Sequence, residues 1–175
     1  MVDIQRIAAG IRLIAMDVDG VLTAGEIIVL ESGEEVKIWN VRDRMGFHLL
    51  KLSGADIKVA WVTGRSSKQV QARADESGID ALFQGCDKKD DALRQLAERF
   101  GVSGEEIAYI GDDVIDIPAM KLAGLGICPC DAVEEVKEYA AIITRSAGGR
   151  GVAREVIDLV LKAHHVWERA AKGYI

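Results

Sequence analysis

One short stretch, residues 11–23, constrains this chain more than any other part of it. It begins with an apolar run that shows no polar alternation after Arg12, which is typical of a strand buried on both faces in a parallel sheet. Asp17 and Asp19 follow where that strand should end, and Gly20 then allows the chain to turn. Because ligands bind at the carboxyl ends of strands in open α/β sheets, the two acids lie where a site is expected.

The close spacing of Asp17 and Asp19 has two interpretations. Like charges this close disfavour each other's ionisation, and a bound Mg²⁺, which prefers oxygen ligands, would relieve that repulsion. The alternative is an ordinary Asp-Gly turn with a spare acid. Taken alone, the stretch favours the two interpretations about equally.

Helical and strand patterns alternate along the rest of the chain, with no long linker and no internal repeat. This alternation predicts an α/β fold, a doubly wound, mostly parallel sheet with right-handed crossovers and helices on both faces. The length of 175 residues suggests one domain, residues 1–175. We expect further strands at 57–62, 81–83, 107–110, 125–128 and 141–144, and helices at 43–52, 88–100, 133–139 and 152–171, with another around Met120. A further helix, capped by Ser66 or Ser67, should run to Ser77.

Residues 26–39 predict a β-hairpin, because the apolar segments 27–30 and 36–39 flank a turn that contains Gly33. The hairpin lies between the first strand and the next helix, so it should project from the carboxyl edge of the sheet. A lone exposed hairpin of this apolar content would be marginal. We therefore expect it to pack on something else, such as another subunit.

Charge and composition exclude several classes of partner. The net charge is −6 and no run of Lys and Arg is longer than two, which argues against nucleic acid or an anionic membrane as the main partner. No apolar run approaches the ~20 residues of a membrane span, and the first residues lack a signal-peptide pattern. The three cysteines, Cys86, Cys128 and Cys130, fit a reducing cytoplasm. Cys128 and Cys130 could bind a metal, but two small hydrophobes flanking a turn are the simpler interpretation.

Polar side chains follow four of the predicted strands, so they should meet at one edge of the sheet. They are Asp17 and Asp19, Thr63, Lys89, and Asp112 with Asp113. Any one of them could be a helix cap. Together, acids, a hydroxyl and a lysine suit phosphoryl transfer, in which a carboxylate is the nucleophile, Mg²⁺ bridges it to the phosphate, and the hydroxyl and the cation hold the phosphoryl oxygens.

Four motifs carry a family resemblance. They are Asp-Val-Asp-Gly-Val-Leu-Thr at 17–23, Thr-Gly-Arg at 63–65, Lys89, and Gly-Asp-Asp at 111–113 with Asp116. In this order they resemble the haloacid dehalogenase superfamily of phosphatases. Residues 39–43, 62–66, 84–85 and 148–156 extend the resemblance to the family of 3-deoxy-D-manno-octulosonate 8-phosphate phosphatases, from about residue 11 to residue 172.

The resemblance implies a role for each matching side chain. Asp17 would be the nucleophile, and Asp19 the general acid that then becomes the base. Thr63 and Lys89 would hold the transferring phosphoryl group. A proton donor must be near the nucleophile but distinct from it, and the two-residue spacing of Asp17 and Asp19 satisfies that requirement.

The same resemblance implies the cofactor Mg²⁺. Its protein ligands would be Asp17, Asp19 through its backbone carbonyl, and Asp112. Asp113 and Asp116 would support them.

Substrate contacts are implied for Arg65, Lys68, Gly64 and Arg42. Arg65 suits a bidentate bond to a substrate carboxylate. Arg44 adds a cation that we expect beside the sugar.

Relatives of this size have no separate cap domain, and no insertion long enough for one follows Asp19 or Thr63. The resemblance implies a homotetramer in which the hairpin at 26–39 covers the neighbour's active site, while the C-terminal tail, residues 164–175, reaches an adjoining one. A cover of this kind would exclude water from the aspartyl-phosphate.

The predicted function is Mg²⁺-dependent hydrolysis of 3-deoxy-D-manno-octulosonate 8-phosphate, in lipopolysaccharide precursor synthesis, by a cytoplasmic enzyme. A phosphatase of a nine-carbon, sialic-acid-type 9-phosphate is an alternative. A non-catalytic phosphoaspartate receiver or oligomeric binding module is an alternative of another class. Asp19 distinguishes a phosphatase from a receiver. A receiver needs a long-lived acyl phosphate and no proton-transfer partner beside its nucleophile, whereas a phosphatase needs that partner for turnover.

Overall fold

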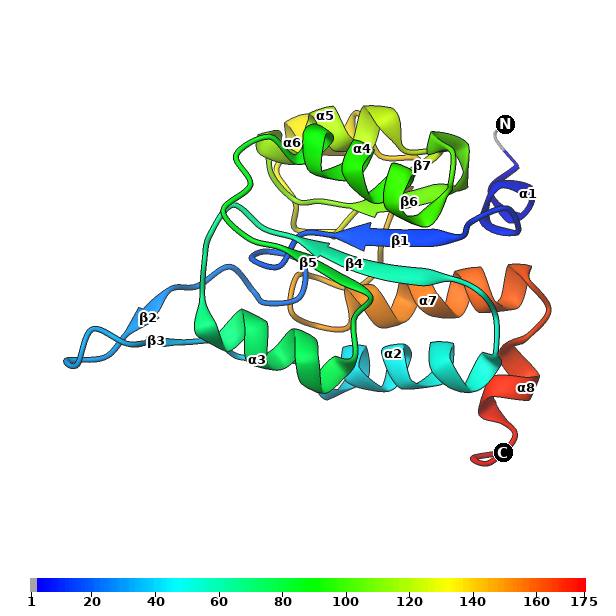
Figure 1. Cartoon of the computed structure of the whole chain (residues 1–175), viewed down its shortest axis with the longest axis horizontal. Helices are drawn as coiled ribbons and strands as arrows, with labels where there is room; N and C mark the ends of the chain where they lie inside the picture. Colours follow the sequence, from blue (N-terminus) through cyan, green and yellow to red (C-terminus); the bar gives the residue numbers. More distant parts are fainter. Residues whose placement is uncertain (1–2) are drawn as a thin grey trace.

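The computed structural model describes residues 3–175 and contains one six-stranded sheet. The strand order is β5-β4-β1-β6-β7-β8, and every neighbouring pair is parallel. The strands are β1 (Leu13–Met16), β4 (Lys58–Val62), β5 (Ala81–Phe83), β6 (Ile107–Ile110), β7 (Leu125–Cys128) and β8 (Ile142–Ile143). The predicted α/β fold with a parallel sheet is confirmed, and β1 lies in its interior (Figure 1).

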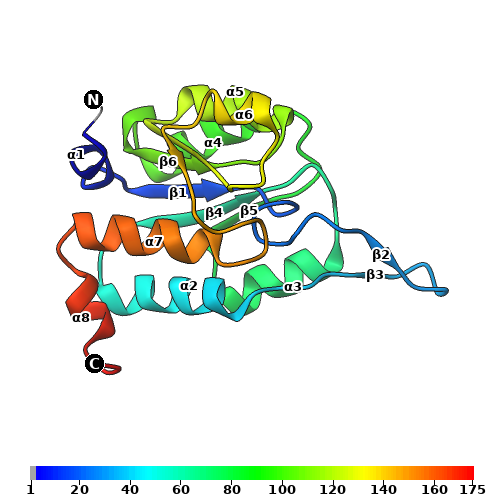
Figure 2. The ribbon, with the colours of Figure 1, turned by 180° about the vertical axis from the view of Figure 1, so that it is seen from behind.

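Helices cover both faces of the sheet (Figures 1 and 2). One layer holds α4 (Lys89–Phe100), α5 (Ile117–Leu122) and α6 (Glu134–Lys137). The other holds α2 (Val41–Ser53), α3 (Lys68–Ser77) and α7 (Val152–Ala163). Shorter elements are α1 (Ile4–Ala8), α8 (Trp167–Ala171) and the 3₁₀ turns at Gly104–Glu106 and Val114–Asp116. Within residues 3–175, none of these helices has the length and hydrophobicity needed to cross a membrane.

Strand β1 shows how the sequence builds two cores. All four of its residues are buried, and successive side chains of a strand point to opposite faces. Leu13 and Ala15 pack in the cluster beneath α4 and α5, whereas Ile14 and Met16 pack in the cluster beneath α2 and α7. The uninterrupted apolar run is thus explained by helices on both sides.

Capping residues set the helix boundaries on the α2 side. Helix α2 begins at Val41, two residues before the predicted start, because the Asn40 side chain accepts a hydrogen bond from the Arg42 amide at 2.9 Å. Of the two candidate caps, Ser66 and Ser67, it is Ser67 that caps α3, and Gly78 ends that helix in the left-handed conformation at φ 63°.

The prediction of one continuous helix over 152–171 is wrong. Helix α7 ends at Ala163, and His165 adopts a positive φ of 56°, which a helix cannot contain. Asp158 accepts a hydrogen bond from Trp167 Nε1 at 3.2 Å, which ties α8 back onto α7. This tertiary contact lies outside what apolar periodicity can indicate.

The hairpin forms as predicted, from β2 (Ile28–Val29) and β3 (Glu35–Val36), which pair antiparallel. Figures 1 and 2 show it projecting beyond the carboxyl ends of the sheet strands. Large apolar side chains on it are exposed, with Val29 59% and Ile38 66% accessible.

Candidate active site

The predicted polar loops meet in one cleft of about 290 Å³ at the carboxyl ends of β1, β4 and β6. Its lining contains most of the side chains named from sequence. They are Asp17, Asp19, Gly20, Gly25, Thr63, Gly64, Arg65, Lys89, Asp112, Asp113 and Ile115.

Asp17 is buried directly after β1 and is held by two donors. Its Oδ1 accepts the Val18 amide at 2.6 Å, and its Oδ2 lies 2.5 Å from Lys89 Nζ. Burial raises the pKa of Asp17 to about 6, against the lowering effect of the Lys89 charge. Lys89, the first residue of α4, has only 1% of its side chain accessible.

Asp116 is the fully buried anchor of the cleft and accepts four hydrogen bonds. Its Oδ1 takes Lys89 Nζ at 2.7 Å and the Tyr109 hydroxyl at 2.8 Å. Its Oδ2 takes the backbone amides of Asp112 at 3.0 Å and Asp113 at 3.3 Å. Asp116 therefore fixes both the lysine and the loop that carries Asp112. Sequence reasoning missed Tyr109, whose only signal is a hydroxyl in an otherwise apolar strand.

The acids fit a divalent cation. Oxygens of Asp17, Asp112 and Asp116 lie within 4.8 Å of one another. Asp112 Oδ1 is buried without a hydrogen-bond partner, and burial beside Asp17 raises the pKa of Asp112 to about 8. Because Asp116 already has four donors, Asp17 and Asp112 are the carboxylates able to hold a metal. Gly20 makes room, since a Cβ there would lie 1.9 Å from Asp112 Oδ2.

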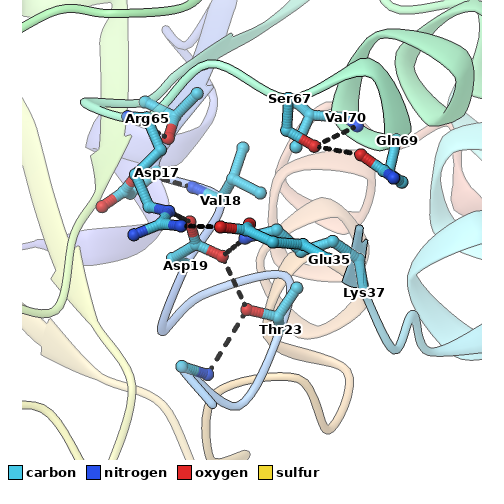
Figure 3. A network of polar contacts seen from close by, with 12 residues as sticks. Asp17, Val18, Asp19, Thr23, Glu35, Lys37, Arg65, Ser67, Gln69 and Val70 are labelled. Atoms are coloured by element: carbon cyan, nitrogen blue, oxygen red, sulfur yellow. Dashed lines mark hydrogen bonds and ion pairs between the residues drawn. The ribbon is translucent and has the colours of Figure 1, made fainter. Parts of the chain in front are cut away.

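Asp19 faces the hairpin of its own chain (Figure 3). Its Oδ1 accepts the Thr23 hydroxyl at 3.3 Å and forms an ion pair with Lys37. Arg65 Nε lies 3.9 Å from Asp19 Oδ2, and the Arg65 guanidinium also pairs with Glu35. Sequence reasoning missed Lys37 and Glu35. The sequence signal for them is two charged residues, two positions apart, in the second half of the predicted hairpin. Residues with this spacing point to the same face of a strand.

The loop after β4 supplies the hydroxyl of the cleft. Thr63 is buried, and its Oγ1 accepts the Arg65 amide at 3.3 Å. Gly64 also lines the cleft, beside Arg65.

Three cations expected near the substrate lie outside this cleft. Lys68 is exposed at the start of α3. Arg42 and Arg44 line a separate cavity of about 590 Å³ between α2 and the end of α3. The expectation that Arg44 lies beside the sugar is not met within one chain, because its Nε pairs with Glu76 at 3.2 Å.

The glycine-rich loop at 148–151 supports the loop that carries Asp17. A Cβ on Gly148 would lie 2.1 Å from the Gly20 carbonyl oxygen, so only glycine allows this approach. The Gly149 amide donates to the Val21 carbonyl at 2.9 Å, and its own carbonyl accepts Asn40 Nδ2 at 3.0 Å. The loop thus joins the active-site turn to the start of α2.

Comparison with known proteins gives concordant matches. Residues 79–156 match the family of haloacid dehalogenase-like hydrolases. The chain is 44% identical over 161 residues to 3-deoxy-D-manno-octulosonate 8-phosphate phosphatase KdsC of Escherichia coli K12, covering 92% of this chain and 85% of the relative.

Solved structures agree with the sequence matches. A crystal structure of the corresponding phosphatase from Yersinia pestis superimposes with a TM-score of 0.91 at 43% identity, covering 95% of this chain and 89% of that one. The Moraxella catarrhalis phosphatase, in complex with magnesium, phosphate and KDO, gives a TM-score of 0.94 at 40% identity, covering 99% and 98%. The chain therefore belongs to the 3-deoxy-D-manno-octulosonate 8-phosphate phosphatase family of the haloacid dehalogenase-like hydrolases.

Proposed function

We propose that this protein is a Mg²⁺-dependent phosphatase that hydrolyses 3-deoxy-D-manno-octulosonate 8-phosphate (KDO 8-phosphate) to KDO and phosphate through an aspartyl-phosphate. The observation that carries the proposal is the buried Asp17 carboxylate, ion-paired to Lys89 and grouped with Asp112 in an open cleft. The Moraxella catarrhalis relative, which holds magnesium, phosphate and KDO, supports the substrate and the cofactor.

Asp17 and Asp112 would hold the Mg²⁺ with the backbone carbonyl of Asp19, while Asp113 and Asp116 keep the Asp112 loop in place. The unpartnered Asp112 Oδ1 fits this role, because a buried anionic oxygen is costly unless something pairs with it. When bound, the ion neutralises the charge that the carboxylates and the phosphate bring together.

Asp17 is the nucleophile that attacks phosphorus, forming a P–O bond as the bond to the sugar oxygen breaks. Lys89 holds Asp17 by one charged hydrogen bond and is itself held by Asp116. Its ammonium and the Thr63 hydroxyl bind the phosphoryl oxygens and offset the charge that develops on them. Fixed donors of this kind need little reorganisation during the reaction.

Asp19 moves the protons. It gives one to the departing sugar oxygen and then takes one from the water that hydrolyses the aspartyl-phosphate. This second step separates the proposal from a receiver, which has to preserve its acyl phosphate.

Arg65, with Gly64 beside it, binds the carboxylate of the substrate, where a guanidinium offers two parallel donors. Lys68 and Arg42 lie outside the cleft of their own chain, so they contact substrate only through an assembly that brings a neighbour to them.

We propose that the assembly is a homotetramer in which the hairpin at 26–39 covers a neighbouring site. The exposed apolar side chains of the hairpin support this, because a contiguous exposed apolar surface commonly marks an interface. Residues 164–175 would reach an adjoining site, although Tyr174 Oη here lies 3.1 Å from His48 Nε2 of its own α2. Residues 1–175 act as one phosphatase domain in the cytoplasm, where the substrate is a small sugar phosphate.

Deleting residues 25–38 tests the assembly. Analytical ultracentrifugation should show a smaller species, and phosphate release should fall with it. A fully active monomer without the hairpin would contradict the shared cover.

The function is tested by phosphate release from a panel of sugar phosphates, with Mg²⁺ and after chelation. We expect the highest kcat/KM with KDO 8-phosphate and no turnover without the metal. Preference for a nine-carbon 9-phosphate would assign the alternative substrate. A stable phosphoprotein without turnover of any ester would indicate a receiver.

A further inference from the structure

Lys37 carries a buried side chain in a mostly exposed hairpin. Only 3% of its side chain is accessible, and its ammonium forms an ion pair with Asp19. Within residues 3–175, Asp19 is the only acid recorded within 4.0 Å of that ammonium. Because lysine is rarely buried this deeply unless it is paired, the contact fixes Lys37 and Asp19 relative to one another.

The two oxygens of Asp19 have different surroundings. Oδ1 accepts both the Thr23 hydroxyl and Lys37 (Figure 3). Oδ2 is buried and has no hydrogen-bond partner, with Arg65 Nε as a more distant neighbour at 3.9 Å. One oxygen is therefore anchored from two sides, and the other is left free on a cleft-lining side chain.

We propose that Lys37 is a positioning residue for the proton transfer, acting through Asp19. Lys37 and Thr23 hold Oδ1, so that Oδ2 is the oxygen that gives a proton to the leaving group. This inference rests on the role proposed above for Asp19. It also gives the hairpin a function within its own chain, separate from any contact with a neighbour.

The other inward-facing hairpin charge extends this connection. Glu35 pairs with Arg65, which lines the same cleft. Glu35 lies in β3 and Lys37 directly after it, two residues on, and both turn toward the cleft. The hairpin is thus attached to the cleft by two ion pairs, and its position fixes the orientation of Asp19.

The test compares Lys37→Met, which keeps the aliphatic stem, with Lys37→Arg, which keeps the charge. Lys58→Met is the matched control, because Lys58 pairs with Asp56 at 2.9 Å and has 40% of its side chain accessible. Each variant is assayed for kcat/KM over phosphate esters whose leaving groups range from p-nitrophenol to alkyl alcohols and KDO. This parameter covers the steps up to departure of the leaving group, and a phenolate needs little protonation.

For Lys37→Met we expect about a 10- to 100-fold loss of kcat/KM with alkyl phosphates, within the range of general acid catalysis. The loss with p-nitrophenyl phosphate should be below about threefold. The larger loss with alkyl phosphates should appear in kcat rather than in KM. Lys37→Arg should recover most of the activity, and Lys58→Met should match the parent. Thr23→Val, which removes the other donor to Oδ1, should show the same dependence on the leaving group.

An equal loss across all esters would overturn the proposal, as would a loss confined to KM, which would make Lys37 a substrate-binding group. If Lys37→Met fails to fold, Thr23→Val decides, and an unchanged leaving-group dependence in Thr23→Val refutes the inference. If the parent cleaves simple esters but not KDO 8-phosphate, the proposed substrate fails while the Lys37 comparison still stands.

Discussion

The cleft and the hairpin differ in which side chains they bury. At the centre of the cleft, a buried lysine is paired with two acids, since Lys89 lies between Asp17 and Asp116. On the hairpin, apolar groups are exposed, as Val29 and Ile38 show. The buried charges at the centre of the cleft therefore find their partners within one chain, whereas the exposed apolar side chains of the hairpin are what the proposed assembly would cover.

Strand β3 and its continuation join the two regions. Glu35 and Lys37 turn inward onto Arg65 and Asp19. Ile38, next to Lys37 in the chain, faces outward and is 66% accessible. The usual pattern of a half-buried strand, with apolar residues inward, is therefore inverted here.

Removing the proposed nucleophile gives the largest expected effect. Asp17→Asn should lower phosphate release by at least about 10³-fold, because an amide cannot form the acyl phosphate. The variant should keep its fold, since Val18 can still donate to the amide oxygen. Phosphate release and circular dichroism measure the two properties. Asp75→Asn, at an exposed position of α3, is the control. Normal turnover in Asp17→Asn would show that Asp17 is not the nucleophile.

Removing the anchor tests whether the cleft depends on buried pairing. Asp116→Asn places an amide among four donors and should lower the free energy of unfolding by about 3 kcal/mol. It should also weaken Mg²⁺ binding about 10- to 100-fold, because the Asp112 loop loses its support. Urea unfolding and calorimetric titration measure these changes. Stability equal to the parent's would show that the buried pairs contribute little.

Shortening apolar side chains tests the hairpin surface. Val29→Ser and Ile38→Ser should each weaken assembly by about 1.5 kcal/mol, roughly tenfold in the dissociation constant, while leaving the monomer folded. Sedimentation equilibrium measures the association. Ile143→Ser, at a site 49% exposed on the edge strand β8, is the control. Unchanged assembly would mean that the apolar surface is not the interface.

Asp43 tests whether burial alone raises the pKa of an acid outside the cleft. It is 3% exposed, and burial raises its pKa from 3.8 to about 6, although the Arg154 amide donates to it at 2.9 Å. The folded protein therefore binds this proton more tightly than the unfolded chain. The contribution of this proton to the free energy of unfolding is complete below pH 3.8, and it is lost as the pH rises through about 6.

Between pH 5 and 7 the parent should lose about 1 kcal/mol of stability that Asp43→Asn keeps. Urea unfolding of both proteins at the two pH values measures this difference. A difference independent of pH would mean that Asp43 has an ordinary pKa.

Features that depend on a local sequence pattern could be predicted from the sequence. The buried run at β1 and the acids that follow it predicted both the sheet and its carboxyl-edge cleft. Capping chemistry limited the start of α3 to Ser66 or Ser67, and Ser67 is the cap. These features succeed because a strand's periodicity and a cap's hydrogen bond involve neighbours in the chain.

Features that depend on tertiary contacts could not be predicted in the same way. The left-handed His165 and the return of α8 onto Asp158 are set by distant packing. The burial of Lys37 and the Tyr109 hydrogen bond to Asp116 join segments that no spacing rule connects.

The central claim is that Asp17 accepts the phosphoryl group beside a bound Mg²⁺. Acid quenching during turnover of KDO 8-phosphate, followed by peptide mass spectrometry, tests it most directly. We expect one phosphoryl group on the peptide that contains Asp17 when Mg²⁺ is present, and none after chelation. Turnover at the full rate with no phosphorylated peptide, or with the label on another residue, would contradict it.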